Sequence, residues 1–227
     1  MRDADRGRIG LAVSGGSDSV ALAVLFWEAL SPFEAMLLTV DHGLRPEAAD
    51  EIEAVEHLAK GLGYGFATMK AESTPQGNTQ AWARRERYRL LRRMADIHQL
   101  RAIVTAHTLD DQAETFLLRL RRRSGLRGLS GMRPVSVRGG LTVLRPFLGA
   151  RREDLRRALT ERGVSWHDDP SNDDARYDRI AVRRMLPSLA TIGRRSPPWA
   201  HPATWSSTLR PTTRCCLNTA GAFWPTP

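Results

Sequence analysis

The chain has 227 residues, of which 41% are hydrophobic, so it can bury the core of one large or two modest domains, and wholesale disorder is disfavoured. No stretch reaches the roughly 18 to 20 consecutive apolar residues that a membrane span needs, and the charged N-terminus leads straight into a strand pattern, so we expect neither a membrane segment nor a signal peptide. The two cysteines, Cys215 and Cys216, are adjacent, which excludes a disulfide framework and a four-thiolate zinc site. We therefore expect a cytoplasmic protein.

The charge of the chain is strongly basic. The formal net charge is +9, and all but two of the 34 basic residues are arginine. This enrichment has two interpretations: a biased genomic base composition, or an anionic partner whose phosphates suit the guanidinium fork. Charge alone does not decide between them.

The tail, residues 194–227, differs from the rest of the chain. It contains no Asp, Glu or Lys, and it follows neither a helical nor a strand period. A proline-rich binding tail is one interpretation, and a frameshifted or otherwise non-native end is the one we favour. We expect the tail to pack poorly and to contribute little to thermal stability.

Residues 9–123 alternate between short apolar runs and helical patterns. Strand patterns occupy residues 9–13, 36–40, 64–69 and 102–106, and helix patterns occupy residues 18–30, 47–60, 78–98 and 110–123. Short parallel-type strands separated by helices predict an α/β fold with a doubly wound parallel sheet.

The pattern changes after residue 132. Apolar runs at 135–137 and 141–144 flank Arg138-Gly139-Gly140, which predicts a hairpin, and helices are predicted at 151–162 and 176–189. We divide the chain into an α/β domain at residues 1–132, a hairpin and helical extension at 133–193, and the tail at 194–227.

A glycine loop joins the first predicted strand to the first predicted helix. Two glycines let the backbone approach a ligand closely, and a helix N-terminus offers unpaired N–H groups to an anion. The alternative is a tight turn with Ser17 or Asp18 as the helix N-cap. Ligands bind at the carboxyl ends of the strands in open α/β sheets, which favours phosphate binding. The candidate phosphate-binding residues are Ser14, Gly15, Gly16, Ser17, Asp18 and Ser19.

Asp18 is the unusual member of this loop. Its carboxylate repels a phosphate unless a cation lies between them, which indicates Mg²⁺ on a polyphosphate. The loop matches neither the Walker pattern nor the dinucleotide-binding pattern.

The sequence S-G-G-x-D-S after a first strand resembles the PP-loop, or N-type, ATP pyrophosphatases. These enzymes use ATP to adenylate a carbonyl oxygen and then displace AMP with a nucleophile. Further motifs follow in order, at residues 40–45, 83–88, 105–115, 128–132, 145–147, 169–172 and 183–187. The ordered set is similar to the catalytic domain of the tRNA(Ile)-lysidine synthetases, from about residue 8 to residue 192.

The resemblance implies an ATP-dependent ligase with ATP and Mg²⁺ as cofactors. Its partners would be free lysine and tRNA(Ile) with the anticodon CAU, and it would join lysine to the wobble cytidine through an adenylated intermediate. Two departures stand out. Arg123 replaces a glycine that the family usually has, and family members usually continue past the catalytic domain where this chain enters the tail. The sequence indicates no oligomeric state.

His107, Asp111 and Glu114 are spaced at i, i+4 and i+7. If the helix reaches back to His107, all three lie on one helical face. In the context of the resemblance, the two carboxylates are candidates to hold Mg²⁺ or the ammonium of lysine, with Asp18 and Asp111 as the metal ligands. The three are also candidate bases toward the lysine amine. The alternative is an acidic first helical turn that complements the helix dipole.

Arg84 and Arg87 are three residues apart on an arginine-rich helix. A solvated basic face is the usual meaning of such a run. The resemblance implies that one of the two contacts the phosphates or the activated cytidine, and the sequence does not say which. We treat both as candidate catalytic residues.

Two other functions stay open. A tRNA cytidine thiolase of the same superfamily needs reactive or cluster-binding cysteines, and none precedes Cys215. A truncated, non-catalytic protein that binds ATP and RNA is the other alternative. We expect lysine, rather than ammonia or sulfide, to be the nucleophile.

Overall fold

The computed structural model describes residues 7–45, 47–122, 125 and 130–167. The helix predicted at 176–189 and the tail at 194–227 lie outside the described residues. Within the described part of the chain, no helix combines the length and the apolar composition that a bilayer span requires.

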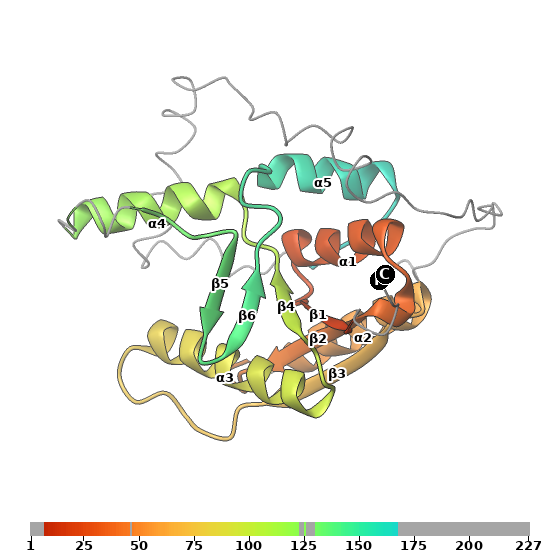
Figure 1. Ribbon diagram of the computed structural model, residues 1–227, viewed down its shortest axis with the longest axis horizontal. Helices are drawn as coiled ribbons and strands as arrows, with labels where there is room; N and C mark the ends of the chain where they lie inside the picture. The colour runs from red at the N-terminus through yellow and green to blue at the C-terminus, as the bar shows by residue number, and fades with distance from the viewer. Residues whose placement is uncertain (1–6, 46, 123–124, 126–129, 168–227) are drawn as a thin grey trace.

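Strands and helices alternate along the chain as the sequence predicts (Figure 1). The strands are β1 (Ile9–Ala12), β2 (Ala35–Asp41), β3 (Gly65–Lys70), β4 (Ala102–Thr105), β5 (Val135–Arg138) and β6 (Leu141–Leu144). The helices are α1 (Ser17–Ala29), α2 (Ala48–Leu62), α3 (Thr79–Ile97), α4 (Leu109–Arg121) and α5 (Arg152–Glu161), with a short 3-10 helix, η2 (Pro32–Glu34), that the sequence patterns did not predict. The α/β fold with a doubly wound parallel sheet is confirmed.

The strands form one sheet in the order β3-β2-β1-β4-β6-β5. The first five strands in this order are parallel, and β5 pairs antiparallel to β6 at the edge. The predicted hairpin is therefore part of the central sheet, because Ile103 of β4 pairs with Val143 of β6. Strands β2 and β3 are added on one side of β1, and the later strands are added on its other side, beginning with β4. The direction in which the chain adds strands therefore reverses between β1 and β4. A ligand site is expected where the loops after these two strands meet.

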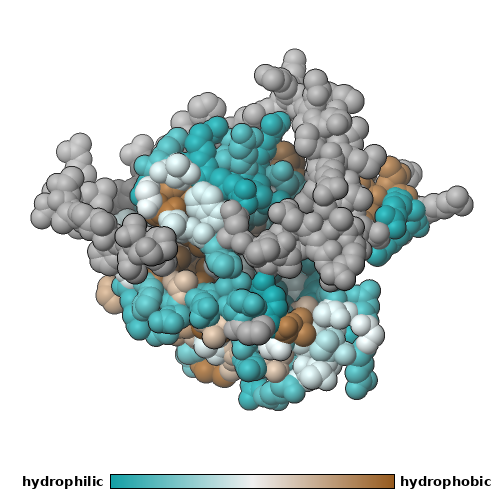
Figure 2. All heavy atoms as spheres, turned by 180° about the vertical axis from the view of Figure 1, so that it is seen from behind, coloured by the Kyte–Doolittle hydropathy of each residue, from teal (hydrophilic) through white to brown (hydrophobic). Residues whose placement is uncertain are grey.

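Helices cover both faces of the sheet. On one face α1 packs against β1, α2 packs against β2 and β3, and α5 packs against α1. Leu22, Val55 and Leu155 are buried in the core that these elements share. On the other face α3 packs through Leu91 and Met94. Successive residues of a strand point to opposite faces, which is why neighbouring residues of β1 belong to different cores. The face seen in Figure 2 is mostly hydrophilic over the described residues, as expected for a surface of charged helices.

Gly10 in the middle of β1 allows the close approach of its neighbours. A Cβ atom at this position would lie 2.5 Å from Leu38 Cδ1 and 2.7 Å from Ile103 Cδ1. Side chains from both adjacent strands thus fill the space above Gly10, and a larger residue there would force β2 and β4 to repack. This tight packing fixes β1 and β4, the two strands that carry the site.

Candidate active site

The glycine loop turns directly from β1 into α1. Gly15 has φ +84°, a conformation that favours glycine, and Gly16 is the N-cap of α1 without a side-chain cap. Neither Ser17 nor Asp18 is the cap. The N–H groups at the start of a helix lack acceptors four residues earlier, and this end of α1 lines the cavity through Gly16, Ser17 and Asp18. The loop therefore has the geometry of an anion-binding turn.

Serine hydroxyl groups hold the loop in shape. The Ser14 backbone N–H donates to Ser19 Oγ over 3.1 Å, and Ser19 Oγ donates to the Gly16 carbonyl over 2.9 Å. Ser19 is buried and Ser14 is exposed. The two serines therefore differ in function: Ser19 braces the turn from inside, and Ser14 is accessible to a ligand.

The second loop of the site connects β4 to α4. Thr108 is fully buried and caps α4, because its backbone N–H donates to Asp111 Oδ2 over 2.7 Å and the Asp111 N–H donates back to Thr108 Oγ1 over 3.4 Å. The backbone of Thr108 is extended, so α4 begins after it and does not reach back to His107. The predicted single helical face that would carry His107, Asp111 and Glu114 therefore does not form. His107, Asp111 and Glu114 nevertheless line one cavity, His107 from the loop and the carboxylates from α4.

A cavity of about 1450 Å³ lies where the two loops meet. It contains side chains from the glycine loop, α3, α4, the hairpin and α5, and all the predicted site residues except Gly15 line it. Among the described residues, nine arginines and three carboxylates line it. The arginines are Arg84, Arg87, Arg119, Arg122, Arg133, Arg138, Arg145, Arg152 and Arg156. Such a surface suits a polyanion.

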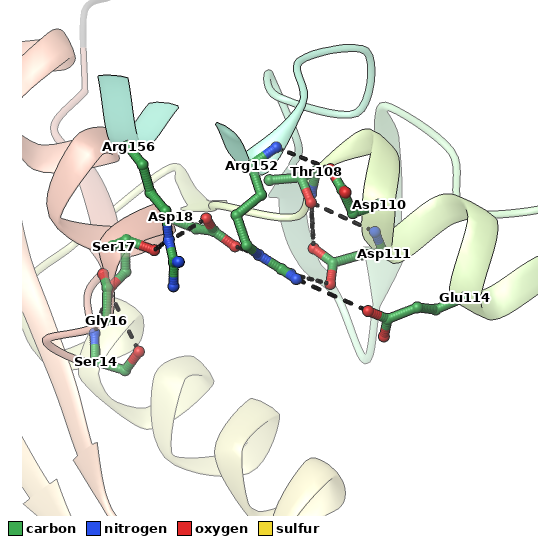
Figure 3. Close-up of polar contacts among 11 residues, drawn as sticks. Ser14, Gly16, Ser17, Asp18, Thr108, Asp110, Asp111, Glu114, Arg152 and Arg156 are labelled. Carbon is green, nitrogen blue, oxygen red and sulfur yellow. Dashed lines mark hydrogen bonds and ion pairs between the residues drawn. The ribbon is translucent and has the colours of Figure 1, made fainter. Parts of the chain in front are cut away.

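The acidic cluster, Asp18, Asp111 and Glu114, surrounds Arg152 (Figure 3). Arg152 Nε donates to Asp18 Oδ2 over 2.8 Å, and its Nη2 donates to Asp111 Oδ1 over 3.1 Å. Its Nη1 lies 3.8 Å from Glu114 Oε1. The acidic cluster thus forms around one guanidinium that comes from α5.

Arg152 is a site residue that the sequence patterns missed. The helix from residue 151 to 162 was predicted, but 134 residues separate Arg152 from Asp18, and nothing local distinguishes it from the other arginines of α5. Arg156, one turn later, donates from Nε to Ser17 Oγ over 3.2 Å and was missed for the same reason. The preceding motif Arg145-Pro146-Phe147 was the one available signal that this region belongs to the site.

Burial and the neighbouring Arg152 act in opposite directions on the pKa of Asp18. Burial raises the pKa of Asp18, and the charge and hydrogen bond of Arg152 offset only part of that rise. Burial also opposes the charge of Arg152, but Asp18, Asp111 and Glu114 together raise its pKa above its ordinary value. The carboxylates therefore stabilise the charged form of Arg152, whereas pairing with Arg152 does not fully offset the effect of burial on Asp18.

His107 is held neutral. Burial and the positive charge of Arg87 lower its pKa to about 4, against the opposing effect of Asp111. Its Nδ1 lies 2.9 Å from Thr105 Oγ1, which fixes the orientation of the ring. At neutral pH the imidazole can accept a hydrogen bond but carries no charge that would attract an anion or repel a cation.

The basic cluster, Arg84, Arg87 and Arg145, lies on α3 and after β6. Arg145 is 3% exposed, and its Nη1 donates to the Arg133 carbonyl over 3.0 Å and to Ser136 Oγ over 2.9 Å. Burial lowers the pKa of the half-buried Arg87, which still stays charged at neutral pH. The Arg84 guanidinium lies 5.6 Å from the ring centroid of Tyr88. Arg84 is exposed, so the cluster runs from the interior to the rim.

The residues that the structure describes supply only part of a donor set for a metal. Among the described residues, no group of three or more His, Cys, Asp and Glu side chains has the arrangement to hold a metal ion. Asp18 and Asp111 lie close enough to share one guanidinium. Mg²⁺ is commonly bound by one or two carboxylates together with substrate phosphates, so two carboxylates beside a phosphate loop fit its chemistry.

Comparison with known proteins gives consistent results. The chain is 46% identical over 189 residues to a tRNA(Ile)-lysidine synthase of Ruegeria pomeroyi, covering 82% of this chain and 45% of the relative. It is 44% identical over 186 residues to the tRNA(Ile)-lysidine synthase of Hyphomonas neptunium, covering 78% of this chain and 50% of that protein. The chain thus spans about half the length of these curated relatives.

Solved structures support the fold. The U34-tRNA thiolase NcsA from Methanococcus maripaludis, solved with its [4Fe-4S] cluster, superposes with a TM-score of 0.69 at 16% identity, covering 90% of this chain and 71% of that one. The NH3-dependent NAD synthetase from Campylobacter jejuni superposes with a TM-score of 0.51 at 13% identity, covering 90% and 82%. At these identities the likeness concerns the fold alone. A sequence profile of the PP-loop domain matches residues 1–189, and the chain therefore belongs to the PP-loop domain family.

Proposed function

We propose that this chain carries the catalytic half of a tRNA(Ile)-lysidine synthase, a ligase that uses ATP to join lysine to the wobble cytidine of tRNA(Ile) with the anticodon CAU. The observation that supports this most directly is that one cavity holds a phosphate-type loop, an acidic cluster and a basic cluster. A lysine ligase that acts on RNA needs all three, because its substrates are a polyphosphate, a cation and a nucleic acid. The similarity to proteins of that name supports the same function.

ATP is the expected occupant of the glycine loop. Ser14, Gly15, Gly16, Ser17, Asp18 and Ser19 would bind its phosphates through the N-terminus of α1 and the loop hydroxyls. Asp18 and Asp111 would hold Mg²⁺, which when bound supplies positive charge that stabilises the transition state at phosphorus. Arg87, with Arg84 nearer the rim, would bind the phosphate oxygens or the activated cytidine.

The reaction would then proceed in two displacements. The C2 carbonyl oxygen of the cytidine attacks the α-phosphorus of ATP, forming an O–P bond while pyrophosphate leaves. The ε-amine of lysine then attacks C2, and the C–O bond to AMP breaks. The amine must lose a proton before it attacks, because the reference pKa of lysine is about 10.4.

The acidic cluster can receive that cation and proton. Glu114 is 3% exposed and Asp111 is half-buried, so both present carboxylates in a region of low dielectric where an ammonium is bound strongly. His107 is neutral, and it can accept a hydrogen bond from the amine as the proton leaves. Ammonia would not require two such carboxylates, and a sulfur transfer needs cysteines that do not precede Cys215.

The test is the transfer of labelled lysine to RNA. The 227-residue chain is incubated with ATP, labelled lysine and a high concentration of the anticodon stem-loop of tRNA(Ile). We expect RNA labelling and AMP release that both depend on the wobble cytidine. RNA modification that proceeds without lysine would contradict the proposal, and ATP binding without AMP release would favour the non-catalytic alternative.

A further inference from the structure

Arg152 has an unusual position for a helix arginine. Its three guanidinium nitrogens each face a different carboxylate, from Asp18, Asp111 and Glu114, on two other helices (Figure 3). A planar guanidinium is suited to such multiple pairing, whereas a lysine ammonium has a single charged atom. Arg152 is therefore the central counterion of the acidic cluster.

The backbone of α5 holds this side chain in place. The Arg152 N–H donates to Asp110 Oδ2 over 2.8 Å, and the Leu109 N–H donates to the Ala150 carbonyl over 2.9 Å. These two bonds join the start of α5 to the start of α4. Leu155 and Leu159 are buried in the core that α1 also contributes to. The position of Arg152 is consequently built into the fold.

The place that the guanidinium fills is the one expected for a cation. The Asp18 and Asp111 side chains are 19% and 22% exposed, so their charges are poorly screened by water. An incoming divalent cation would need the same carboxylate oxygens that now accept from Arg152. Two cations cannot share this space without strong repulsion, because their charges would lie close together in a region that water screens poorly.

We propose that Arg152 is a positioning residue that keeps divalent metal out of the acidic cluster until ATP is bound. This inference rests on the proposed assignment of Asp18 and Asp111 as metal ligands. The polyphosphate offers the guanidinium new anionic partners, so Arg152 exchanges carboxylate oxygens for phosphate oxygens as the metal arrives. Metal binding and nucleotide binding are therefore coupled through one side chain.

The experiment is a titration with Mn²⁺ in the absence of nucleotide, followed by the electron paramagnetic resonance signal of free Mn²⁺. It compares the full chain with the variants Arg152→Gln, Arg152→Lys and Arg157→Gln. Arg157 is a matched control because it lies on the same helix, is exposed and pairs with Asp154. We expect Arg152→Gln to bind Mn²⁺ at least about tenfold more tightly than the unmodified chain, Arg152→Lys to be intermediate, and Arg157→Gln to be unchanged.

The nucleotide is the second variable. With a non-hydrolysable ATP analogue, the difference in Mn²⁺ affinity between Arg152→Gln and the unmodified chain should shrink, because the phosphates then engage Arg152. The double variant Asp18→Asn/Arg152→Gln should lose the gain seen in Arg152→Gln. Circular dichroism checks that each variant folds, and Arg152→Lys carries the test if Arg152→Gln does not.

Two results would overturn the proposal. One is equal Mn²⁺ affinity, without nucleotide, in the unmodified chain and in every folded Arg152 variant. The other is tighter binding in the Arg152 variants that persists when Asp18 is replaced, since the metal site would then lie elsewhere. A failure of lysine transfer leaves the Mn²⁺ affinities intact, so the two proposals can fail separately.

Discussion

The acidic and basic clusters of the cavity differ in how their charges are balanced. The acidic cluster is paired with Arg152, with contacts of 2.8 and 3.1 Å to two of its carboxylates. In the basic cluster, the described hydrogen bonds of Arg145 go to a backbone carbonyl and to hydroxyl groups, which are uncharged at neutral pH. The acidic cluster is thus held together by a cation of the protein, whereas Arg145 is held by neutral groups. We expect the basic cluster to attract anions and the acidic cluster to attract cations.

Replacing Asp18 should have the largest effect on catalysis. We expect Asp18→Asn to lower AMP release about a thousandfold or more, because the variant removes a carboxylate that would position the metal at the phosphates. The measurement is release of AMP from ATP in the presence of the RNA stem-loop. The exposed Asp154→Asn on α5 is the control. Comparable AMP release by Asp18→Asn and the unmodified chain would remove Asp18 from the site.

Within the basic cluster, Arg87 and Arg84 should have different roles. Arg87 is half-buried and close enough to His107 to lower the pKa of that residue, whereas Arg84 is exposed beside Tyr88. We expect Arg87→Gln to lower kcat of adenylation about a hundredfold, since it removes a charge from a region of low dielectric. Arg84→Gln should act mainly on KM for the RNA, by about tenfold. The reverse order of effects would assign the catalytic role to Arg84.

Glu114 should affect the second step more than the first. We expect Glu114→Gln to raise KM for lysine about ten- to a hundredfold, because a charge-assisted hydrogen bond is worth roughly 1.5 to 3 kcal/mol, while the release of pyrophosphate in the first step changes little. Asp111→Asn is a less selective probe, since Asp111 also caps α4 through Thr108. Steady-state kinetics at varied lysine concentration separate the two steps. Unchanged KM for lysine in Glu114→Gln would exclude this carboxylate as the ammonium ligand.

The sequence predicted those parts of the fold and the site whose signals are local. Each strand of the parallel sheet is a short apolar run, and the loop around Gly15 is a contiguous motif, so periodicity and turn chemistry were sufficient. The meeting of this loop with His107 depends on the order of the strands, which the structure shows: both follow strands that are neighbours in the sheet, β1 and β4.

The remaining features depend on tertiary contacts. Arg152 reaches Asp18 only because α5 packs beside α1 and because Asp110 fixes its first turn. The start of α4 depends on whether the Asp111 N–H donates to the Thr108 hydroxyl or to a backbone carbonyl of an earlier helical turn. The spacing of residues in the sequence does not decide between these two acceptors. The sequence likewise did not predict that the acidic cluster and the basic cluster lie apart within one cavity, because their members come from different helices and loops.

The smallest expected effect concerns His107 and the dependence of stability on pH. Its pKa in the folded protein is about 4, below the reference value of about 6.5, so between these values the unfolded chain binds a proton that the folded chain does not. Stability should therefore fall as the pH drops through this window, by no more than about 2 kcal/mol at pH 5. Asp18 acts in the opposite sense because its pKa is raised, so the pH dependence of stability of the unmodified chain alone does not isolate His107.

The difference in stability between the unmodified chain and His107→Asn isolates it, since asparagine keeps an acceptor near the position of Nδ1 for Thr105. Urea unfolding at pH 7.5, 6 and 5 should show a smaller loss of stability for His107→Asn, with the exposed His57→Asn matching the unmodified chain. Parallel curves for all three proteins would show that His107 titrates alike in the folded and unfolded states, and that the basic cluster does not extend its influence to the imidazole.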